Sequence, residues 1–424
     1  MAGAVGSGVQ GLNTPRVGAR ERRILRDLAK RVADVAALPI QAERARLWRK
    51  LNALEPERPM VLANPQGGWR ELVPETALQC PGLCGFEMSL RRKIYRHEHI
   101  PDDYPITATF GVGWTVEVGG YGLGETQTRS EDLGSYRWDP PVKSEADWDG
   151  VHPRSILIDH EATARTEALA QDILGDILLV RRLGESACRV KLTRDLIHLR
   201  GLDQIMFDMY DNPRFLHRMM AFLRDEKQRE WEVYEREGVL SLNNGSDHIT
   251  GSGGVSHTDE LPAADFAGHV RMKDMWCWGE SQETVGVGPD QFFEFVLQYQ
   301  LPLMNRFGLV DYGCCEPLDR KFDLLIRHIP RLRSVAVSPW CNRKVAAEKL
   351  GNRYIYVYKP NPSRICSPRA DFEAAEQDIR ETLQIARGCC VSIIMKDTHT
   401  FMNEPERVTR WAEMASRLAA ENAR

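Results

Sequence analysis

Short apolar segments alternate with helical segments from about residue 155 onward, and this rhythm is the strongest constraint on the fold. In one helical stretch, 212–236, Asn212 is the predicted cap and Pro213 takes the first helical position. Strands separated by helices predict a parallel sheet. The predicted strands are Gly238–Leu242, His269–Trp276, Leu309–Tyr312, Ser334–Val337, Tyr354–Val357 and Cys390–Met395. In a chain of 424 residues we expect this α/β sheet to close as a single (β/α)8 TIM barrel.

The first 150 residues follow a different pattern and are expected to decorate the barrel. Residues 1–55 are interpreted as an N-terminal extension with a flexible, Gly-rich start and a helix over 21–55. The apolar run at 59–64 ends in a Pro/Gly turn and predicts the first strand of a barrel domain spanning 56–424. Residues 80–150 are rich in Gly, Trp and Tyr and are interpreted as an insertion of loops and short strands.

Composition and charge exclude several classes of function. A formal net charge of −4 gives no bulk attraction to nucleic acid or to an acidic membrane surface. The sequence contains neither a secretory signal pattern nor eighteen successive apolar residues, so no membrane span is expected. The ten cysteines form no CxxC pair and resemble no disulfide framework. We therefore expect a cytoplasmic protein with reduced thiols.

Polar and aromatic side chains follow strand after strand, at the end where barrel enzymes place their chemistry. Polar loops occur in any protein, and this accounts for many of these residues. The residues that follow the predicted strands are Asn243, Asn244, Asp247, His248, Glu280, Cys314, Cys315, Glu316, Trp340, Cys341, Lys359, Asn361, Lys396, Asp397 and His399. From this rim, and from the strand-end Trp276, we expect the substrate to be bound by Asn243, Asp247, Trp276, Trp340 and Lys396.

A thiol, a carboxyl and an imidazole at three strand ends match the ligands that zinc accepts. Cys315, Glu280 and His399 are the predicted metal ligands. The alternative is that the cysteines are buried and pack as small apolar side chains. The sequence alone leaves both interpretations open.

Several stretches of the second half resemble the uroporphyrinogen-decarboxylase-like proteins that work beside corrinoid methyl-transfer systems. The resemblance covers about residues 190–424 and implies a (β/α)8 barrel. The stretches that carry it are Gly279-Glu280-Ser281-Gln282-Glu283, Val285-Gly286-Val287-Gly288-Pro289, Tyr312-Gly313-Cys314-Cys315-Glu316-Pro317-Leu318-Asp319, Val337-Ser338-Pro339-Trp340, Asn243-Asn244-Gly245, Gly251-Ser252-Gly253-Gly254 and Thr258-Asp259-Glu260-Leu261-Pro262.

The resemblance implies a methyltransferase that moves a methyl group to the cobalamin of a partner corrinoid protein. The expected methyl donor is a small methoxylated compound, in particular an aromatic one, or another methylated compound. Glu280 and His399 are then expected around the leaving oxygen as catalytic residues, with Cys315 as a metal ligand or pocket wall. In the coenzyme M methyltransferases of this superfamily a His-x-Cys and a later Cys bind zinc. Here Cys315 keeps its ligand type, the first His is absent, and His399 lies near the later position.

Two other functions remain open. One is decarboxylation of a porphyrin or other carboxylate. However, true uroporphyrinogen decarboxylases carry Arg-Gln-Ala-Gly-Arg after the first strand, and this chain reads Asn64-Pro65-Gln66-Gly67-Gly68-Trp69-Arg70. The other is a scaffold protein that binds a corrinoid without catalysis. The oligomeric state, monomer or homodimer, also stays open.

Overall fold

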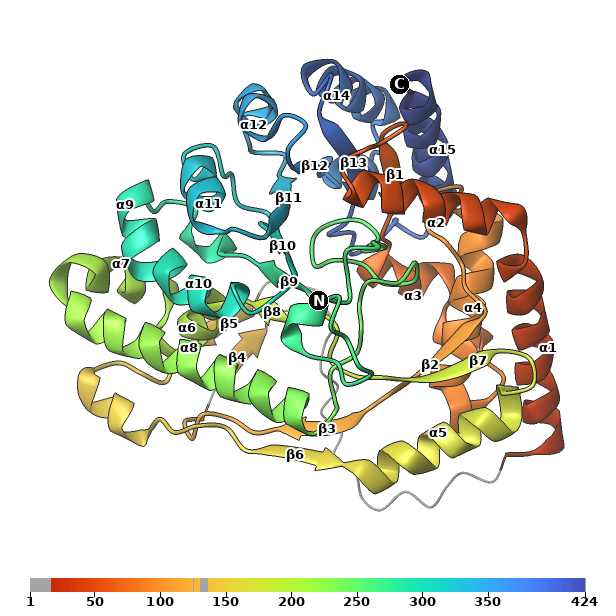
Figure 1. The fold of residues 1–424 in the computed structure, drawn as a ribbon, viewed down its shortest axis with the longest axis horizontal. Coiled ribbons are helices and arrows are strands. Elements are labelled where there is room, and N and C mark those ends of the chain that lie inside the picture. Colours follow the sequence, from red (N-terminus) through yellow and green to blue (C-terminus); the bar gives the residue numbers. More distant parts are fainter. Residues whose placement is uncertain (1–16, 125, 130–135, 424) are drawn as a thin grey trace.

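The centre of the molecule is a parallel sheet of seven strands, seen in a computed structural model that describes residues 17–124, 126–129 and 136–423. Figure 1 shows these strands in an arc with helices on the outside. In spatial order they are β1 (Met60–Ala63), β13 (Cys390–Met395), β12 (Ile355–Tyr358), β11 (Leu332–Val337), β10 (Leu309–Tyr312), β9 (Trp276–Gly279) and β8 (Arg189–Val190). The predicted parallel sheet is confirmed.

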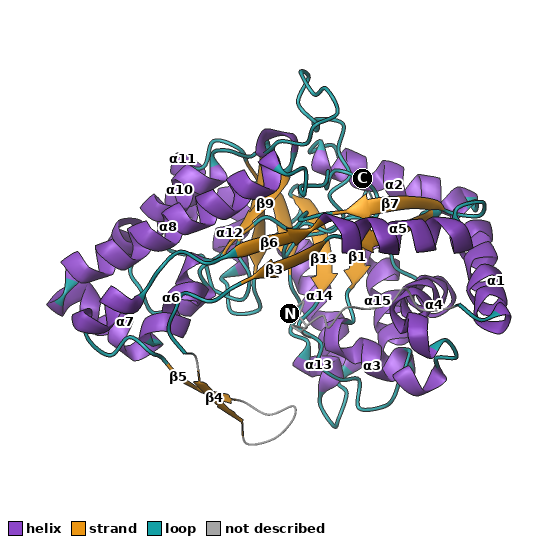
Figure 2. Cartoon of the chain, turned by 90° about the horizontal axis from the view of Figure 1, so that it is seen from below, coloured by secondary structure: helices purple, strands orange, loops and turns teal. Residues whose placement is uncertain are grey.

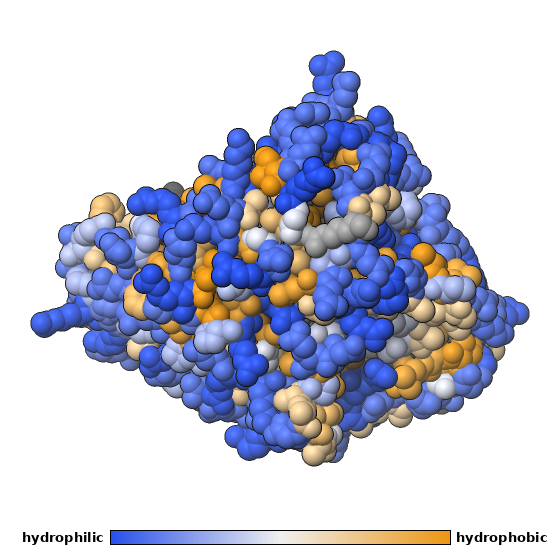
Figure 3. Space-filling model, turned by 45° about the horizontal axis from the view of Figure 1, so that its top comes forward, coloured by the Kyte–Doolittle hydropathy of each residue, from blue (hydrophilic) through white to orange (hydrophobic). Residues whose placement is uncertain are grey.

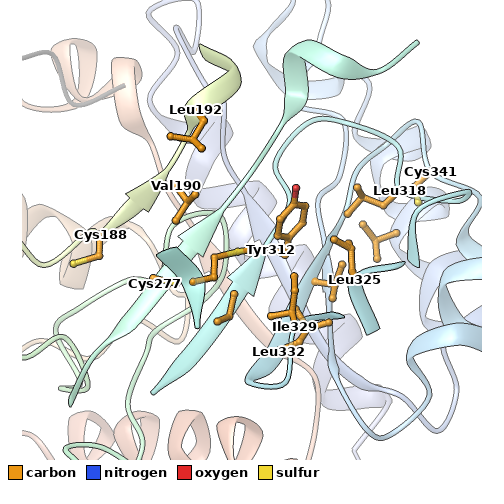
Figure 4. Packing of buried hydrophobic residues seen from close by; sticks show 14 of the residues in the cluster. Cys188, Val190, Leu192, Cys277, Tyr312, Leu318, Leu325, Ile329, Leu332 and Cys341 are labelled. Carbon is orange, nitrogen blue, oxygen red and sulfur yellow. The ribbon is translucent and has the colours of Figure 1, made fainter. Parts of the chain in front are cut away.

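Alternate residues of each strand point outward into one large apolar cluster, because successive side chains of a strand face opposite sides. Cys277 and Tyr312 belong to this cluster, which Figure 4 shows from close by. The helices of this half are α6 (Leu192–Arg200), α7 (Leu202–Asp211), α8 (Pro213–Arg236), α9 (Pro289–Phe292), α10 (Gln298–Met304), α11 (Phe322–His328), α12 (Arg343–Leu350), α13 (Ser363–Cys366), α14 (Phe372–Ile385) and α15 (Glu406–Glu421). The prediction of a helix over 212–236 is confirmed by α8, which follows Asn212.

The other face of the sheet packs against helix α2 (Pro39–Asn52) over part of its area and carries polar side chains elsewhere. Leu62 of β1 and Val357 of β12 lie in one apolar cluster with Trp48 of α2. On the same face, the buried carboxyl of Asp311 accepts a hydrogen bond from Ser334 Oγ at 2.7 Å, and Ser334 is in register with Ile355 of the apolar cluster. Apolar and polar side chains therefore share this face of the sheet.

The free edge of β1 is capped by two carboxylates instead of a strand. Asp103 accepts a hydrogen bond from the N–H of Val61 at 2.8 Å, and Asp102 accepts one from the N–H of Ala63 at 2.9 Å. In the described part of the chain no strand pairs with this edge. The predicted parallel α/β architecture is therefore present, whereas the closure of an eight-stranded barrel is not seen among these hydrogen bonds.

Two predicted strands differ from the observed ones. The segment Gly238–Leu242 is reduced to one parallel bridge between Leu240 and Glu185. The segment His269–Trp276 contains a turn at Met272–Asp274, since the Asp274 carboxylate accepts a hydrogen bond from the backbone N–H of Arg271 at 3.0 Å. The strand β9 begins only after this turn, so Glu280 still follows its end.

The N-terminal part forms its own apolar cluster beside the sheet. The predicted helix over 21–55 is two helices, α1 (Ala19–Ala36) and α2, because Pro39 starts a new one. The interpretation of 80–150 as loops and short strands is wrong for its first part. The helix α4 (Cys84–His99) lies there and buries Leu90 and Ile94 in a cluster that it shares with α1. Its many basic residues concealed this apolar face in the sequence.

The remaining elements of this part are short. Strand β2 (Thr109–Gly113) pairs in parallel with β7 (Leu179–Leu183). Two antiparallel pairs complete it, one of which, β4–β5, extends away from the body in Figure 2. The other elements are α3 (Trp69–Leu72), α5 (His160–Leu174), β3 (Thr115–Val118), β6 (Ile156–Asp159), β4 (Thr126–Arg129) and β5 (Tyr136–Asp139). The expected flexible start concerns mainly residues 1–16, which lie outside the described residues.

The surface is mainly hydrophilic on the face that Figure 3 shows, with apolar residues in separate patches. No described helix combines the length and the apolar character that crossing a bilayer demands. All ten cysteines carry free thiols.

Candidate functional site

Two cysteines and two buried lysines meet at the carboxyl ends of β10, β12 and β13. Gly313 follows β10 with φ at 100°, a conformation that favours glycine, and turns the chain so that Cys314 comes next. Lys359 and Lys396 follow β12 and β13. The Nζ of Lys396 lies 3.9 Å from the Sγ of Cys314, and the Nζ of Lys359 donates to the carbonyl oxygen of Cys314 at 2.9 Å.

A loop from the Gly-rich segment carries Ser252 between the two lysines. The Nζ of Lys359 donates to Ser252 Oγ at 2.5 Å, and the Nζ of Lys396 donates to the same oxygen at 3.2 Å. The backbone N–H of Ser252 donates to Asp311 Oδ2 at 3.3 Å. Burial raises the pKa of Asp311 to about 6, although Ser334 and Lys359 oppose this shift. Ser252 therefore links both ammonium groups to the inner face of the sheet.

Glycine is needed at position 251 because the loop that carries Ser252 packs closely against Trp278 there. Its replacement gives a first prediction. A Cβ at Gly251 would lie 2.0 Å from Cγ of Trp278, whose indole is anchored by a hydrogen bond from Nε1 to the Gly313 oxygen at 2.9 Å. Gly251→Ala is expected to destabilise the protein by about 1–3 kcal/mol, measured as a shift of the urea unfolding midpoint. Gly286→Ala is the control, because nothing lies within 4 Å of its Cβ. Equal midpoints for the two variants would contradict this packing.

The two thiols differ in their surroundings. Their Sγ atoms are 3.6 Å apart, and Cys315 Sγ lies 3.5 Å from Asp397 Oδ2. The hydrogen bond from Cys315, together with Lys359 and Lys396, lowers the pKa of Cys314. The pKa of Cys315 is raised because its thiol takes part in this hydrogen bond, because it is partly buried and because the Asp397 carboxylate lies beside it. Of the two thiols, Cys314 is therefore the one whose ionisation the surroundings favour.

Glu280 is a buried carboxyl group at the end of β9. Its side chain accepts a hydrogen bond from the N–H of Gln282 at 3.3 Å, and only 3% of the residue is exposed. Burial, assisted by the carboxylates of Glu283 and Glu316, raises the pKa of Glu280 well above its usual value of 4.5. Burial therefore favours the protonated form of this carboxyl group, which is the form that can act as an acid.

Glu316 and Gln300 hold the strand ends that carry these groups. Glu316 accepts hydrogen bonds from the N–H of Ser281 at 3.1 Å and from the N–H of Cys314 at 2.9 Å. Gln300 donates to the carbonyl oxygen of Glu280 at 2.8 Å. Glu316 thus joins the loop after β9 to the loop after β10, and fixes the acid and the thiolate relative to the same backbone frame.

The predicted substrate-binding residues lie in different places. Only Lys396 lies beside the cysteines. The side-chain amide of Asn243 binds the backbone of β9. It donates to the Trp276 carbonyl oxygen at 2.9 Å and accepts a hydrogen bond from the backbone N–H of Trp276 at 2.9 Å. Trp276 itself is buried with Leu261 and Leu309.

The two remaining predicted residues stand apart from this core. Asp247 accepts a hydrogen bond from Thr107 Oγ1 at 3.1 Å and pairs with His248. Trp340 is 68% exposed.

The three predicted zinc ligands are not assembled into one site. Nowhere in the described residues do three or more His, Cys, Asp or Glu side chains group as a metal ion requires. His399 is exposed, and its chain turns after Asp397, which has φ at 61°. Thr398 is instead held inward by donating to the Asn64 oxygen at 3.0 Å. The residues present therefore do not fit zinc, and no step of the chemistry below uses it.

Several residues of the site carried no predicted role. Lys359 stood among the strand-end residues without an assignment, and Ser252 lay in a glycine cluster interpreted only as a close-approach loop. Asp311 lies inside a predicted strand. Its position as an isolated acid among apolar residues was the one signal that could have indicated a role in the site. The packing of a loop against a strand brings these residues together, and this is not visible in local spacing.

Comparisons with known proteins give likeness to solved structures alone. No family model matches the chain, and no curated protein matches it. Among solved structures, a methyltransferase from Methanosarcina mazei matches 88% of this chain and 98% of its own, with 10% identity and a TM-score of 0.48. A likeness of this degree leaves the function to be argued from the site.

Proposed function

We propose that this chain is a methyltransferase that moves a methyl group from a small methoxylated donor, in particular an aromatic one, to the cobalamin of a partner corrinoid protein. One observation carries the proposal: the carboxyl group of Glu280, whose pKa burial raises, lies at the carboxyl ends of parallel strands and is joined through Glu316 to Cys314 and the lysine pair beside it. The family likeness of the stretches around Glu280 and Cys314 agrees with it.

A methyl ether is a poor methyl donor because its leaving oxygen is basic. Protonation of that oxygen as the methyl group departs lowers the barrier, and general acids of this kind contribute about 10²–10⁴-fold. Glu280 is suited to this role because burial raises its pKa and so favours its protonated form. Gln300 and Glu316 hold its backbone, so the acid is positioned before the donor binds.

The corrinoid of the partner protein supplies the nucleophile that accepts the methyl group. The partner must then approach the carboxyl ends of the strands. Two large apolar side chains are exposed in loops on this side, Trp340 after β11 at 68% and Val285 after β9 at 53%. A corrinoid protein that docks on this side would cover both side chains, and the removal of apolar surface from water would favour the complex.

A decarboxylase of a porphyrin or other carboxylate is the second candidate, and the lysine pair favours it. Two buried ammonium groups could hold a substrate carboxylate in the way that the arginines of true uroporphyrinogen decarboxylases do. The arginine of the corresponding stretch, Arg70, is exposed, and Gln66 accepts a hydrogen bond from the N–H of Asp397 at 2.7 Å. The first candidate is preferred because this stretch presents no arginine to a substrate.

A methyl-transfer assay tests the proposal directly. The purified chain, mixed with free cob(I)alamin or a corrinoid protein in its cob(I) state, is expected to convert a methoxylated aromatic compound to the free phenol. Phenol release and the absorbance change of the corrinoid are the measurements. Release of CO2 from uroporphyrinogen, without phenol formation from any methoxylated aromatic compound, would instead support the decarboxylase.

A further inference from the structure

The two buried lysines of the site share one hydroxyl group and have no carboxylate partner. Lys359 is 3% exposed and Lys396 is 7% exposed. Their acceptors are Ser252 Oγ, the Cys314 oxygen and the Cys314 sulfur, and neither ammonium forms an ion pair with a carboxylate in the described parts of the chain. Lysine is almost never buried without a paired anion, because desolvation of its charge is costly.

We propose that Lys359 and Lys396 bind a carboxylate group of the substrate, so that the methyl donor is an anion. This inference rests on the proposed function in one respect, since only that function makes the bound molecule a methyl donor. The anion site itself does not depend on methyl transfer. It names the substrate class: a methoxylated compound that carries a carboxylate.

The number of hydrogen-bond donors supports a carboxylate in particular. An ammonium group has three N–H donors. Lys359 uses two of them, on Ser252 Oγ and the Cys314 oxygen, and Lys396 uses two, on Ser252 Oγ and the Cys314 sulfur. One donor remains on each lysine, and the two ammonium groups lie side by side because both reach the same oxygen. Two adjacent donors match the two oxygens of one carboxylate.

The nearby acids of the protein are bonded to other groups. Asp311 accepts hydrogen bonds from Ser334 Oγ and from the Ser252 N–H. Asp397 Oδ2 lies 3.5 Å from Cys315 Sγ. The thiolate of Cys314 balances part of the charge, but it contacts only Lys396. Cys315 and Asp397, which lie beside this group of residues, are partly exposed.

Selective alkylation of Cys314 tests the anion site without a known substrate and without a corrinoid. The thiolate attacks the CH2 carbon of iodoacetate, a C–S bond forms, the C–I bond breaks and iodide leaves. Iodoacetamide reacts in the same way but carries a neutral amide where iodoacetate carries a carboxylate. Cys84 is exposed and serves as the internal reference in the same molecule. Rates at each cysteine are measured by mass spectrometry of peptides.

Iodoacetate is expected to be favoured over iodoacetamide at Cys314 by about tenfold or more relative to the same ratio at Cys84, since two nearby cations attract the carboxylate. Benzoate should protect Cys314 from iodoacetamide, whereas benzamide should not. Equal selectivity at the two cysteines, or no alkylation of Cys314 by either reagent, would overturn the proposal.

Substitution of the lysines gives a matched comparison. Lys359→Met and Lys396→Met are each expected to reduce the selectivity toward that of Cys84. Lys321→Met is the control, because Lys321 is also buried but donates to the Thr284 oxygen at 2.9 Å instead of to Ser252 or a cysteine. A loss of selectivity in the control as well would refute a local anion site. If a lysine variant does not fold, the selectivity of the unsubstituted protein and the benzoate protection still decide the matter.

The result is separable from the proposed function. Selectivity for iodoacetate without any methyl transfer would keep the anion site and leave the decarboxylase as the reaction. Methyl transfer from neutral and anionic methoxybenzenes at equal rates, with no selectivity at Cys314, would keep the methyltransferase and remove the anion site.

Discussion

Glu280→Gln is expected to lower the rate of methyl transfer by about 100-fold or more, because glutamine keeps the shape of the side chain but has no proton to donate to the leaving oxygen. The loss should appear in the turnover rate, measured as phenol release, and the urea midpoint should change little. The matched comparison is Glu283→Gln, three residues farther along the same loop, which removes one of the carboxylates that raise the pKa of Glu280 but leaves the acid itself in place. Glu283 accepts a hydrogen bond from Thr193 Oγ1 at 2.7 Å, and glutamine can keep it.

The pH profile separates an acid from a merely structural group. The pKa of Glu280 is raised well above 4.5, and its protonated form is the active one. Activity should therefore be full below the raised pKa and fall as pH rises through it. The residual activity of the Gln variant should lack this fall. Near-normal turnover of the variant at pH 7, or the same alkaline fall in both proteins, would remove Glu280 from the chemistry.

Asp102→Ala is expected to cost about 3–5 kcal/mol of stability, because it leaves a buried arginine without its partner. Arg96 and Asp102 form a salt bridge of 2.5 Å, with 8% and 0% of their side chains exposed. The same carboxylate also accepts a hydrogen bond from the backbone N–H of Ala63 at 2.9 Å and from that of Tyr104 at 3.1 Å. Urea unfolding followed by circular dichroism measures the loss.

A surface ion pair provides the comparison for this prediction. Asp172 pairs with Arg22 on the exposed helices α5 and α1, and Asp172→Ala should change the midpoint little because solvent screens such pairs. Asp102→Asn should lie between the two, since its oxygen can still accept one backbone hydrogen bond. A midpoint for Asp102→Ala as high as that of Asp172→Ala would show that the edge of β1 does not depend on this carboxylate.

The sequence predicted the bounds of a strand correctly where the strand is mainly apolar along its length. Leu309–Tyr312 and Cys390–Met395 were predicted with the bounds that the structure has, because strands buried on both faces appear as mainly apolar runs, interrupted here by Asp311 and Ser392. The positions of Glu280, Cys315 and Lys396 after strands followed from the same pattern. Strand 269–276 was misplaced because Asp274 bonds the backbone N–H of Arg271, and side-chain bonding of this kind is not part of a hydropathy pattern.

The sequence by itself determined the parallel α/β class and the end of the sheet where the chemistry lies, since both depend on periodicity within a few residues. Only the tertiary structure decided which strand-end residues meet. Ser252, Asp311 and Lys359 come from segments 48 or more residues apart, and their contacts depend on how a loop packs against three strands. In the same way, the positive φ of Asp397 turns the chain after β13, and His399, two residues later, is exposed.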